Sequence, residues 1–405
     1  HFSIKKFIIP EEISSFVKEN GSRFVLRFNQ ENTPKQKAYE LIKGELESFD
    51  PMVLLFLTNL NRIKWKTPHS TGEVRKEEKK FKKYDDISIV SLFLSIGEDV
   101  REIKFLILSK EKTRGTEGSK MDYIKIAFRM NEHFDTVISS DVTNLFAFFP
   151  TKVHTGLSFL IQAPFELTKN REEVQEDDEK NQTLWKILHN LFKESLSVLK
   201  KEGLVNLEFL QLLPINSVLS ENNHIYDDFS ESLAKKLLQE PLIPTQRGYA
   251  LPDEVLISRT AGLENLFISR DIEKMFDRNK WVHKNIRKQS FAELRTFLRE
   301  KVEVESVSIE DVAREISVKI LKTKEDSWFR RFYTFLIDHE NQWQKGKKGA
   351  ELRQQPIILT SKNQLVEPFD ENDIPQVYLP GESSTYFKTV KKAILESEEA
   401  LRFLN

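Results

Sequence analysis

The sequence predicts an α+β fold that is divided into more than one domain. The chain has 405 residues, which is long for a single domain. Short runs rich in aromatic and β-branched side chains crowd residues 87–165 and indicate strands. Helical apolar stripes alternate with short strand-like segments over residues 206–405, so a mixed α/β region is expected there.

The composition narrows the class of protein. The 62 basic and 63 acidic residues nearly cancel, which argues against nucleic acid as a partner. The chain has no cysteine, so disulfides, thiolate metal sites and cysteine nucleophiles are excluded, and a reducing, cytoplasmic location is expected. No apolar run approaches the roughly 18 residues of a membrane-spanning helix, and the start has no signal-peptide pattern. No histidine pair has metal-ligand spacing, so no metal site is expected.

The first segment, residues 1–66, carries both strand and helix patterns. Residues 22–28 (SRFVLRF) alternate apolar and basic side chains, which predicts a half-buried strand. Thr33 as N-cap and Pro34 at the first helical position predict the start of a helix. Residues 53–57 (VLLFL) are strongly apolar, so we expect them in a core.

Residues 66–86 (KTPHSTGEVRKEEKKFKKYDD) are highly charged. This composition predicts a linker or a solvated hairpin; the alternative, a basic edge that faces phosphate, is weakened by the interleaved glutamates. Strand patterns then run through residues 87–165, and a helical stripe of leucines follows from Thr183 to Leu199. We expect one mostly β sheet that is packed by this helix.

Two proline-containing segments resemble each other. Residues 241–252 (PLIPTQRGYALP) and 356–368 (PIILTSKNQLVEP) share a proline, two apolar residues, one further residue and a threonine. Gly248 and Asn363 stand three positions after that threonine, and both residue types readily adopt the left-handed conformation of a hairpin turn. The pair predicts two similar β-hairpins and suggests an internal duplication.

The common catalytic motifs are absent from the sequence. It contains no G-x-S-x-G, no G-x-x-x-x-G-K-[ST] and no H-E-x-x-H. Two candidate sites remain, namely Ser22 with its preceding glycine and the loop FELTKNREEVQ, which is centred on Arg171. The alternative for Arg171 is an ordinary exposed arginine that pairs with Glu172 or Glu173.

The segment LFAFFPTKVHTGLSFLIQAPFELTKNREEV resembles the sacsin-like, or NO VEIN-like, branch of the GHKL ATPases, which are related to the ninety-kilodalton heat-shock chaperone. The segments NGSRFVLRF and DPMVLLFLTNL resemble the end of that family's ATP-binding domain, and the likeness is looser beyond about residue 200. The family's motifs occur in order: Phe149-Pro150-Thr151, Thr155-Gly156-Leu157, Asn170-Arg171 and Trp185.

The resemblance implies a three-part architecture. Residues 1–66 would be the C-terminal end of a GHKL-type α/β sandwich that binds ATP. Residues 67–205 would be a β-rich, transducer-like middle domain with a left-handed βαβ crossover. Residues 206–405 would be the mixed α/β C-terminal region with the two similar hairpins.

The resemblance also implies roles for individual residues. Arg171 matches the position from which a middle-domain arginine reaches the ATP γ-phosphate, and arginine suits that role because it stays charged and can donate two hydrogen bonds to phosphate oxygens. Lys169 and Asn170 are assigned to nucleotide binding beside it. Ser22 matches a threonine whose hydroxyl lies near the adenine. ATP and Mg²⁺ would be the cofactors of the parent protein.

The expected function is that of a segment of an ATP-driven, chaperone-like ATPase or of a bacterial antiviral defence system. The alternative is a non-catalytic protein-interaction module that keeps the fold. The motifs of the ATP pocket do not occur in this chain and are expected upstream of His1, so the chain alone should not hydrolyse ATP. The expected partners are an upstream ATP-binding domain or subunit and a client protein, and a homodimer is left open.

Overall fold

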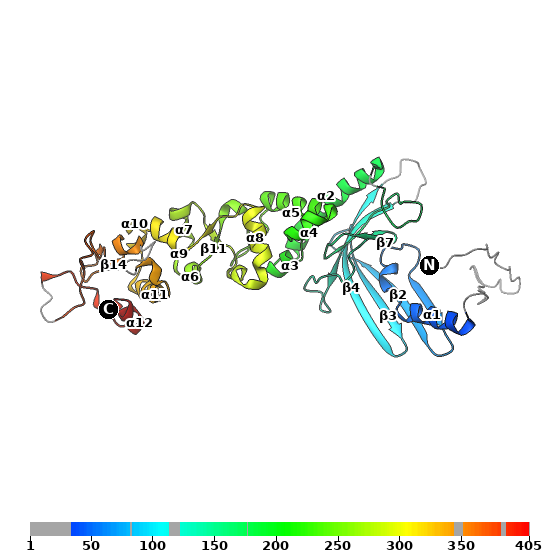
Figure 1. Cartoon of the computed structure of the whole chain (residues 1–405), viewed down its shortest axis with the longest axis horizontal. Helices are drawn as coiled ribbons and strands as arrows, with labels where there is room; N and C mark the ends of the chain where they lie inside the picture. Colours follow the sequence, from blue (N-terminus) through cyan, green and yellow to red (C-terminus); the bar gives the residue numbers. More distant parts are fainter. Residues whose placement is uncertain are drawn as a thin grey trace.

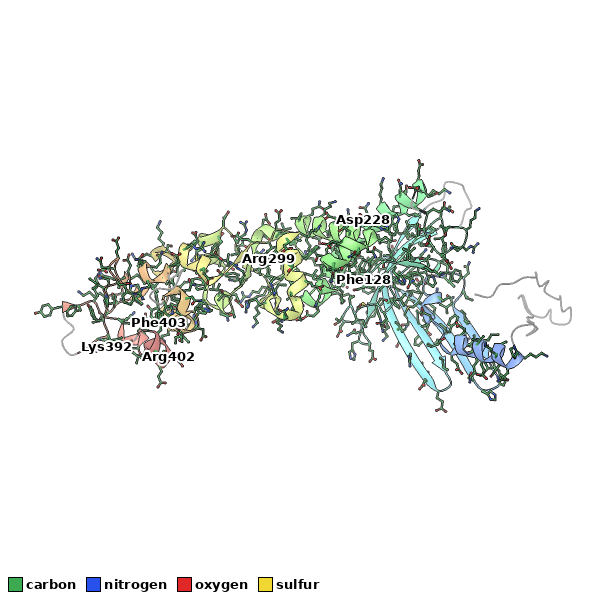
Figure 2. The ribbon with its side chains drawn as sticks, viewed as in Figure 1. Phe128, Asp228, Arg299, Lys392, Arg402 and Phe403 are labelled. Carbon is green, nitrogen blue, oxygen red and sulfur yellow. The ribbon has the colours of Figure 1, made fainter. Side chains whose placement is uncertain are left out.

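The computed structural model describes residues 34–81, 83–112, 122–175, 177–343, 351–381 and 386–404. The predicted strand at residues 22–28, Ser22 and the predicted cap Thr33 lie outside these ranges. The molecule is elongated, with a large sheet at the N-terminal end and a tail of short helices and strands that leads to the C-terminus (Figure 1). Phe128 in the sheet and Phe403 near the C-terminus lie in these two separate parts (Figure 2).

The large sheet has eight strands in the order β1-β2-β3-β4-β5-β8-β6-β7. Neighbouring strands are antiparallel, except that β6 and β8 pair in parallel. The predicted β-rich nature of residues 87–165 is confirmed. The strands are β1 (Arg62–Lys66), β2 (Thr71–Lys80), β3 (Ile87–Ile96), β4 (Asp99–Lys112), β5 (Asp122–Met130), β6 (Asn144–Ala147), β7 (Phe149–His154) and β8 (Leu160–Gln162).

Strand β2 corrects the prediction made for residues 66–86. The charged stretch is neither a linker nor a free hairpin, because β2 pairs with β1 on one side and with β3 on the other. Val74 and Lys76 are buried, whereas Arg75 between them stays partly exposed. Alternate side chains thus face a core, and the aliphatic stem of a lysine can be buried like an apolar side chain.

Both faces of the sheet are covered. On one face, α2 (Glu179–Lys201) buries Leu184, Leu188 and Leu191 in the same core as Phe128. On the other face, the 3₁₀-helix η2 (Pro51–Leu54) and the residues after it bury Leu54, Leu55 and Phe56 in a second core. The centre of the apolar run at residues 53–57 is therefore core, as predicted, and its two end residues are partly buried. Residues 51–66, assigned by sequence to an upstream domain, share the core and the hydrogen bonds of the large sheet.

One feature that the resemblance implies is not confirmed by the described strands of the sheet. Between β1 and β8, no helix occurs in the part of the chain that the structure describes, so a βαβ crossover is not seen within these strands. Parallel strands joined through helices occur instead in the tail, where β11 (Val255–Ser258) pairs in parallel with β12 (Lys280–Trp281) and β13 (Ser306–Val307). The helices between β11 and β12 are α6 (Leu263–Leu266) and α7 (Ser269–Phe276).

The tail contains two units built in the same order. In each unit, three helices are followed by a β-hairpin, a 3₁₀-helix and an end helix, with further elements between them. These are η3 (Pro252–Glu254), β11, α6, α7, β12 and η5 (Gln289–Phe291) in the first unit, and η6 (Glu340–Gln342) and η7 (Glu351–Gln354) in the second. The first unit contains α3 (Leu207–Gln211), α4 (Ser217–Asn222), α5 (His224–Gln239), β9 (Ile243–Pro244), β10 (Tyr249–Ala250), η4 (Lys284–Arg287) and α8 (Ala292–Glu300). The second unit contains α9 (Ile309–Glu315), α10 (Val318–Leu321), α11 (Asp326–Ile337), β14 (Ile358–Leu359), β15 (Leu365–Val366), η9 (Lys392–Ile394) and α12 (Glu398–Leu404).

The two hairpins have the geometry that the sequence predicts. Gly248 and Asn363 have positive φ values, 85° and 56°. The Thr245 hydroxyl donates to the Gly248 carbonyl at 3.1 Å, and the Thr360 hydroxyl donates to the Gln364 carbonyl at 3.0 Å. Thr245 and Thr360 also bridge equivalent valines outside the hairpins, which shows that the repeat extends past the turns. These valines are Val282 and Val390.

Candidate functional site

The Arg171 loop, residues 163–175, lies between β8 and α2 and folds as a small hairpin. Leu167 and Val174 form an antiparallel bridge across it. The Thr168 amide donates to the Glu173 carbonyl at 2.9 Å, and the Arg171 amide donates to the Thr168 carbonyl at 2.8 Å. The backbone of the loop is thus fixed by its own hydrogen bonds rather than left to solvent.

Asn170 holds the tip of this hairpin. Its side-chain oxygen accepts from the Thr168 hydroxyl at 2.5 Å and from the Glu172 amide at 3.2 Å. Its side-chain nitrogen donates to the Glu172 carboxylate at 3.1 Å. Asparagine is favoured in turns for such local bonds. The structure therefore uses the polar atoms of Asn170 to shape the turn, whereas the resemblance assigned them to a nucleotide.

Asn181, in the first turn of α2, joins the two ends of the loop. Its side-chain nitrogen donates to the carbonyls of Glu166, at 2.9 Å, and Gln175, at 2.8 Å. Its side-chain oxygen accepts from the Glu166 amide at 2.9 Å, and the residue is fully buried. Sequence reasoning missed this residue, although Asn181 lies on the same helical stripe as Leu184 and Leu188, where a polar side chain must find partners.

Arg171 lies exposed on this rigid loop, at the end of β8 where the sequence placed it. Its φ is 59°, in the left-handed region that costs a non-glycine residue roughly 1–2 kcal/mol. Neither its guanidinium nor the Lys169 ammonium has a hydrogen bond or ion pair among the described residues. The alternative, a pair of Arg171 with Glu172 or Glu173, is not found among the described residues, and the Glu172 carboxylate binds Lys152 at 2.6 Å instead.

Arg171 lies beside a groove of about 770 Å³, which we call the Arg171 groove. Its walls come from residues 57–60, from residues 147–150 and from the Arg171 loop. Phe148, at the tip of the β6–β7 hairpin, also has a positive φ, 67°. Such backbone conformations are costly for bulky side chains and concentrate at functional sites. Two strained residues thus border one groove.

The Arg171 groove combines a cationic side with an apolar side. Arg171 and Lys169 supply positive charge, and Glu166, the carboxylate among the described lining residues, is paired with Lys180 at 3.2 Å. Leu60 and Phe149 are 43% and 56% exposed and form part of the apolar side. The groove is suited to a ligand with an anionic group and an apolar or aromatic part.

Neither a metal centre nor a membrane span is found in the described part of the chain. No group of three or more histidine, aspartate or glutamate residues there could hold a metal ion. Of the helices that the structure describes, none has both the length and the apolar character needed to cross a membrane. Comparisons of the chain with known proteins give no significant match to a family model, to a curated protein or to a solved structure.

Proposed function

We propose that the chain is the transducer and C-terminal part of an ATP-driven, chaperone-like ATPase, and that Arg171 contacts the γ-phosphate of ATP. The observation that carries the proposal is an exposed, unpaired arginine with a strained backbone conformation at the edge of a groove. The loop that holds it is fixed by the hydrogen bonds of Asn181. ATP and Mg²⁺ would be held by an upstream domain or subunit that docks against this groove.

The chemistry assigned to Arg171 is electrostatic. As the γ-phosphate is transferred, negative charge develops on its oxygens, and a guanidinium fixed beside them stabilises that charge without reorganising. The hydrogen bonds of the loop fix the backbone from which Arg171 projects, so only its side chain has to be ordered when the ligand binds, which limits the entropic cost of the contact. Lys169 would add positive charge to the same groove. Because the arginine acts only when the two domains are docked, hydrolysis becomes coupled to domain closure.

A second function, binding of a protein partner without catalysis, is favoured by the apolar side of the Arg171 groove. Leu60 and Phe149 are exposed there, and exposed apolar side chains beside charged ones are typical of interaction sites. In this alternative, Arg171 would anchor an acidic group of the partner instead of a phosphate. The two functions differ in what happens when Arg171 is replaced.

The test measures single-turnover ATP hydrolysis at saturating ATP in the protein that carries the ATP-binding domain together with this chain. We expect Arg171→Ala to leave ATP affinity nearly unchanged and to slow hydrolysis at least severalfold, because the contact acts in the transition state. Arg171→Lys should restore only part of the rate, since a point charge cannot reproduce the two-donor geometry. Arg101→Ala, at an exposed arginine of β4, is the matched control.

Equal rates for all three variants and the unmodified protein would contradict a catalytic role for Arg171. If Arg171→Ala then weakened the capture of a defined protein partner while hydrolysis was unchanged, the interaction-module function would replace it. The 405-residue chain alone should show no ATP turnover above buffer. Turnover by the chain alone would contradict the assignment of the nucleotide pocket to another domain.

A further inference from the structure

The first unit of the tail contains a groove of about 520 Å³ between α4, α5 and α8, which we call the unit-one groove. Ile215, Ala292 and Phe297 contribute apolar surface to it, and Ser230 of α5 lies among the lining residues. Val218 and Leu219, on α4 at its side, are 64% and 41% exposed. An opening of this size between helices is within the usual range of binding pockets.

The second unit has aromatic packing where the first unit has this groove. Its end helix α12 packs on α11, and the rings of Tyr333 and Phe403 stack with centroids 5.3 Å apart and 22° between their planes. Trp343 packs edge-on against the same Phe403 ring at 5.1 Å. Tyr333 is fully buried, and its hydroxyl donates to the Ile357 carbonyl at 2.9 Å.

The two units can be aligned residue by residue along their third helices. Each buried residue in the first half of α5 has a buried counterpart in α11 at a constant spacing, which is the expected result when two helices present the same face to equivalent cores. The counterparts are Ile225 and Trp328, Tyr226 and Phe329, Phe229 and Phe332, Ser230 and Tyr333, and Leu233 and Leu336.

This alignment gives Ser230 the position of Tyr333. The end helices can also be aligned in sequence, with Leu294 of α8 beside Ala400 of α12 and the buried Phe297 beside the partly buried Phe403. Their packing differs, because α12 packs on α11 whereas α8 packs on α3 rather than on α5. The first unit therefore keeps the phenylalanine of its end helix but has a serine where the second unit has the stacking tyrosine. The described residues of α5 and α8 make no ring contact with each other, and the unit-one groove occupies the space.

We propose that the unit-one groove receives an aromatic side chain from a peptide segment of a protein partner, and that this segment is basic. The aromatic ring would take the place that Tyr333 fills in the second unit and would pack on Phe297. A buried aromatic side chain anchored in a pocket commonly provides much of the affinity of a protein interface. This inference does not depend on the role of Arg171.

The charge at the rim of the unit-one groove determines the chemistry of the partner. Glu221, Asp227 and Glu300 line it, and none of these three carboxylates has an ion pair or side-chain hydrogen bond within the described ranges. The only basic lining residue, Lys301, is already paired with Glu231 at 2.8 Å. A partner segment with lysine or arginine on either side of its aromatic residue would complement this rim.

The test uses the full chain and a short acetylated, amidated peptide with phenylalanine between lysines, and it measures binding by isothermal titration at low and at physiological salt. We expect binding that weakens with salt, because the rim contacts are exposed. Replacing the peptide's phenylalanine by alanine should reduce the affinity by on the order of tenfold or more. Replacing its lysines by glutamates should abolish binding.

Two variants of the protein locate the site. Ser230→Tyr should fill the unit-one groove as Tyr333 fills the second unit, so it should reduce peptide affinity by on the order of tenfold or more without lowering the thermal midpoint. Ser230→Ala, the matched control, should bind like the unmodified chain. If Ser230→Tyr does not fold, the surface pair Glu221→Lys with Glu300→Lys replaces it and should abolish binding. Failure of the unmodified chain to bind, or equal binding by the aromatic and alanine peptides, would overturn the proposal.

Discussion

The hydrogen bonds that Asn181 makes to both ends of the Arg171 loop lead to a quantitative prediction about that loop. Replacing Asn181 by alanine removes three hydrogen bonds, two donated by its amide nitrogen and one accepted by its oxygen. These bonds connect Glu166, at the start of the loop, with Gln175, near its end. The helix should remain, because alanine is a strong helix former and Asp178 still caps α2.

The size of the effect follows from the number of bonds. An internal hydrogen bond contributes about 1 kcal/mol net, so the loss of three should destabilise the closed loop by about 3 kcal/mol. Because 1.4 kcal/mol corresponds to a tenfold change in an equilibrium constant, the loop should open on the order of a hundredfold more often. The effect should be local, since Leu184 and the rest of the helix stripe still pack on the sheet.

Hydrogen exchange measured by mass spectrometry on peptides that cover residues 163–175 tests this prediction. The amides of Thr168 and Arg171, which are bonded within the loop, should exchange on the order of a hundredfold faster in Asn181→Ala. Gln182→Ala, at the exposed neighbouring position, is the control and should exchange like the unmodified chain. If the two variants exchanged alike, the loop would not depend on Asn181, and the argument for a pre-positioned Arg171 would fail.

Three further predictions follow from the backbone, the repeat and one partly buried histidine. Arg171→Gly should stabilise the loop by about 1 kcal/mol relative to Arg171→Ala in urea unfolding, because glycine has no steric penalty at φ 59°; no difference would mean that the backbone relaxes. Thr245→Val and Thr360→Val should each cost about 1 kcal/mol through the same lost hydroxyl bond, and widely different costs would contradict the equivalence of the hairpins. Burial lowers the pKa of His189, so stability should be complete above its unfolded pKa of about 6.5 and should fall as the pH drops below it; His189→Phe should reduce that loss, measured as the urea midpoint at two pH values.

Much of the fold could be predicted from local sequence. The runs of aromatic and β-branched residues in residues 87–165 form strands because their alternate side chains face two cores. The leucine stripe of α2 is buried as its period requires. Gly248 and Asn363 take positive φ because a tight hairpin turn needs it. Both residue types adopt positive φ readily, so the turns could be recognised from the sequence.

Other features depended on partners that are distant in sequence. The charged residues of β2 form a strand only because β1 and β3 lie on its two sides and supply its hydrogen bonds. Asn181 clamps residues 166 and 175 only after α2 has packed beside the loop. The unit-one groove is lined by Ser230 of α5 together with residues of α4 and α8, and local sequence does not show that these helices lie side by side.

The sequence by itself determined the strands of residues 87–165, the helix that packs on them and the two hairpin turns, and it placed Arg171 on an exposed loop between an apolar strand and an apolar helix. Only the tertiary structure decided that this arginine is unpaired, that its loop is clamped and that a groove lies beside it. The physical reason is the distance along the sequence over which each kind of interaction acts. Periodicity and turn preference act between near neighbours, whereas hydrogen-bond partners, ion pairs and cavities are set by residues that meet only when the chain has folded.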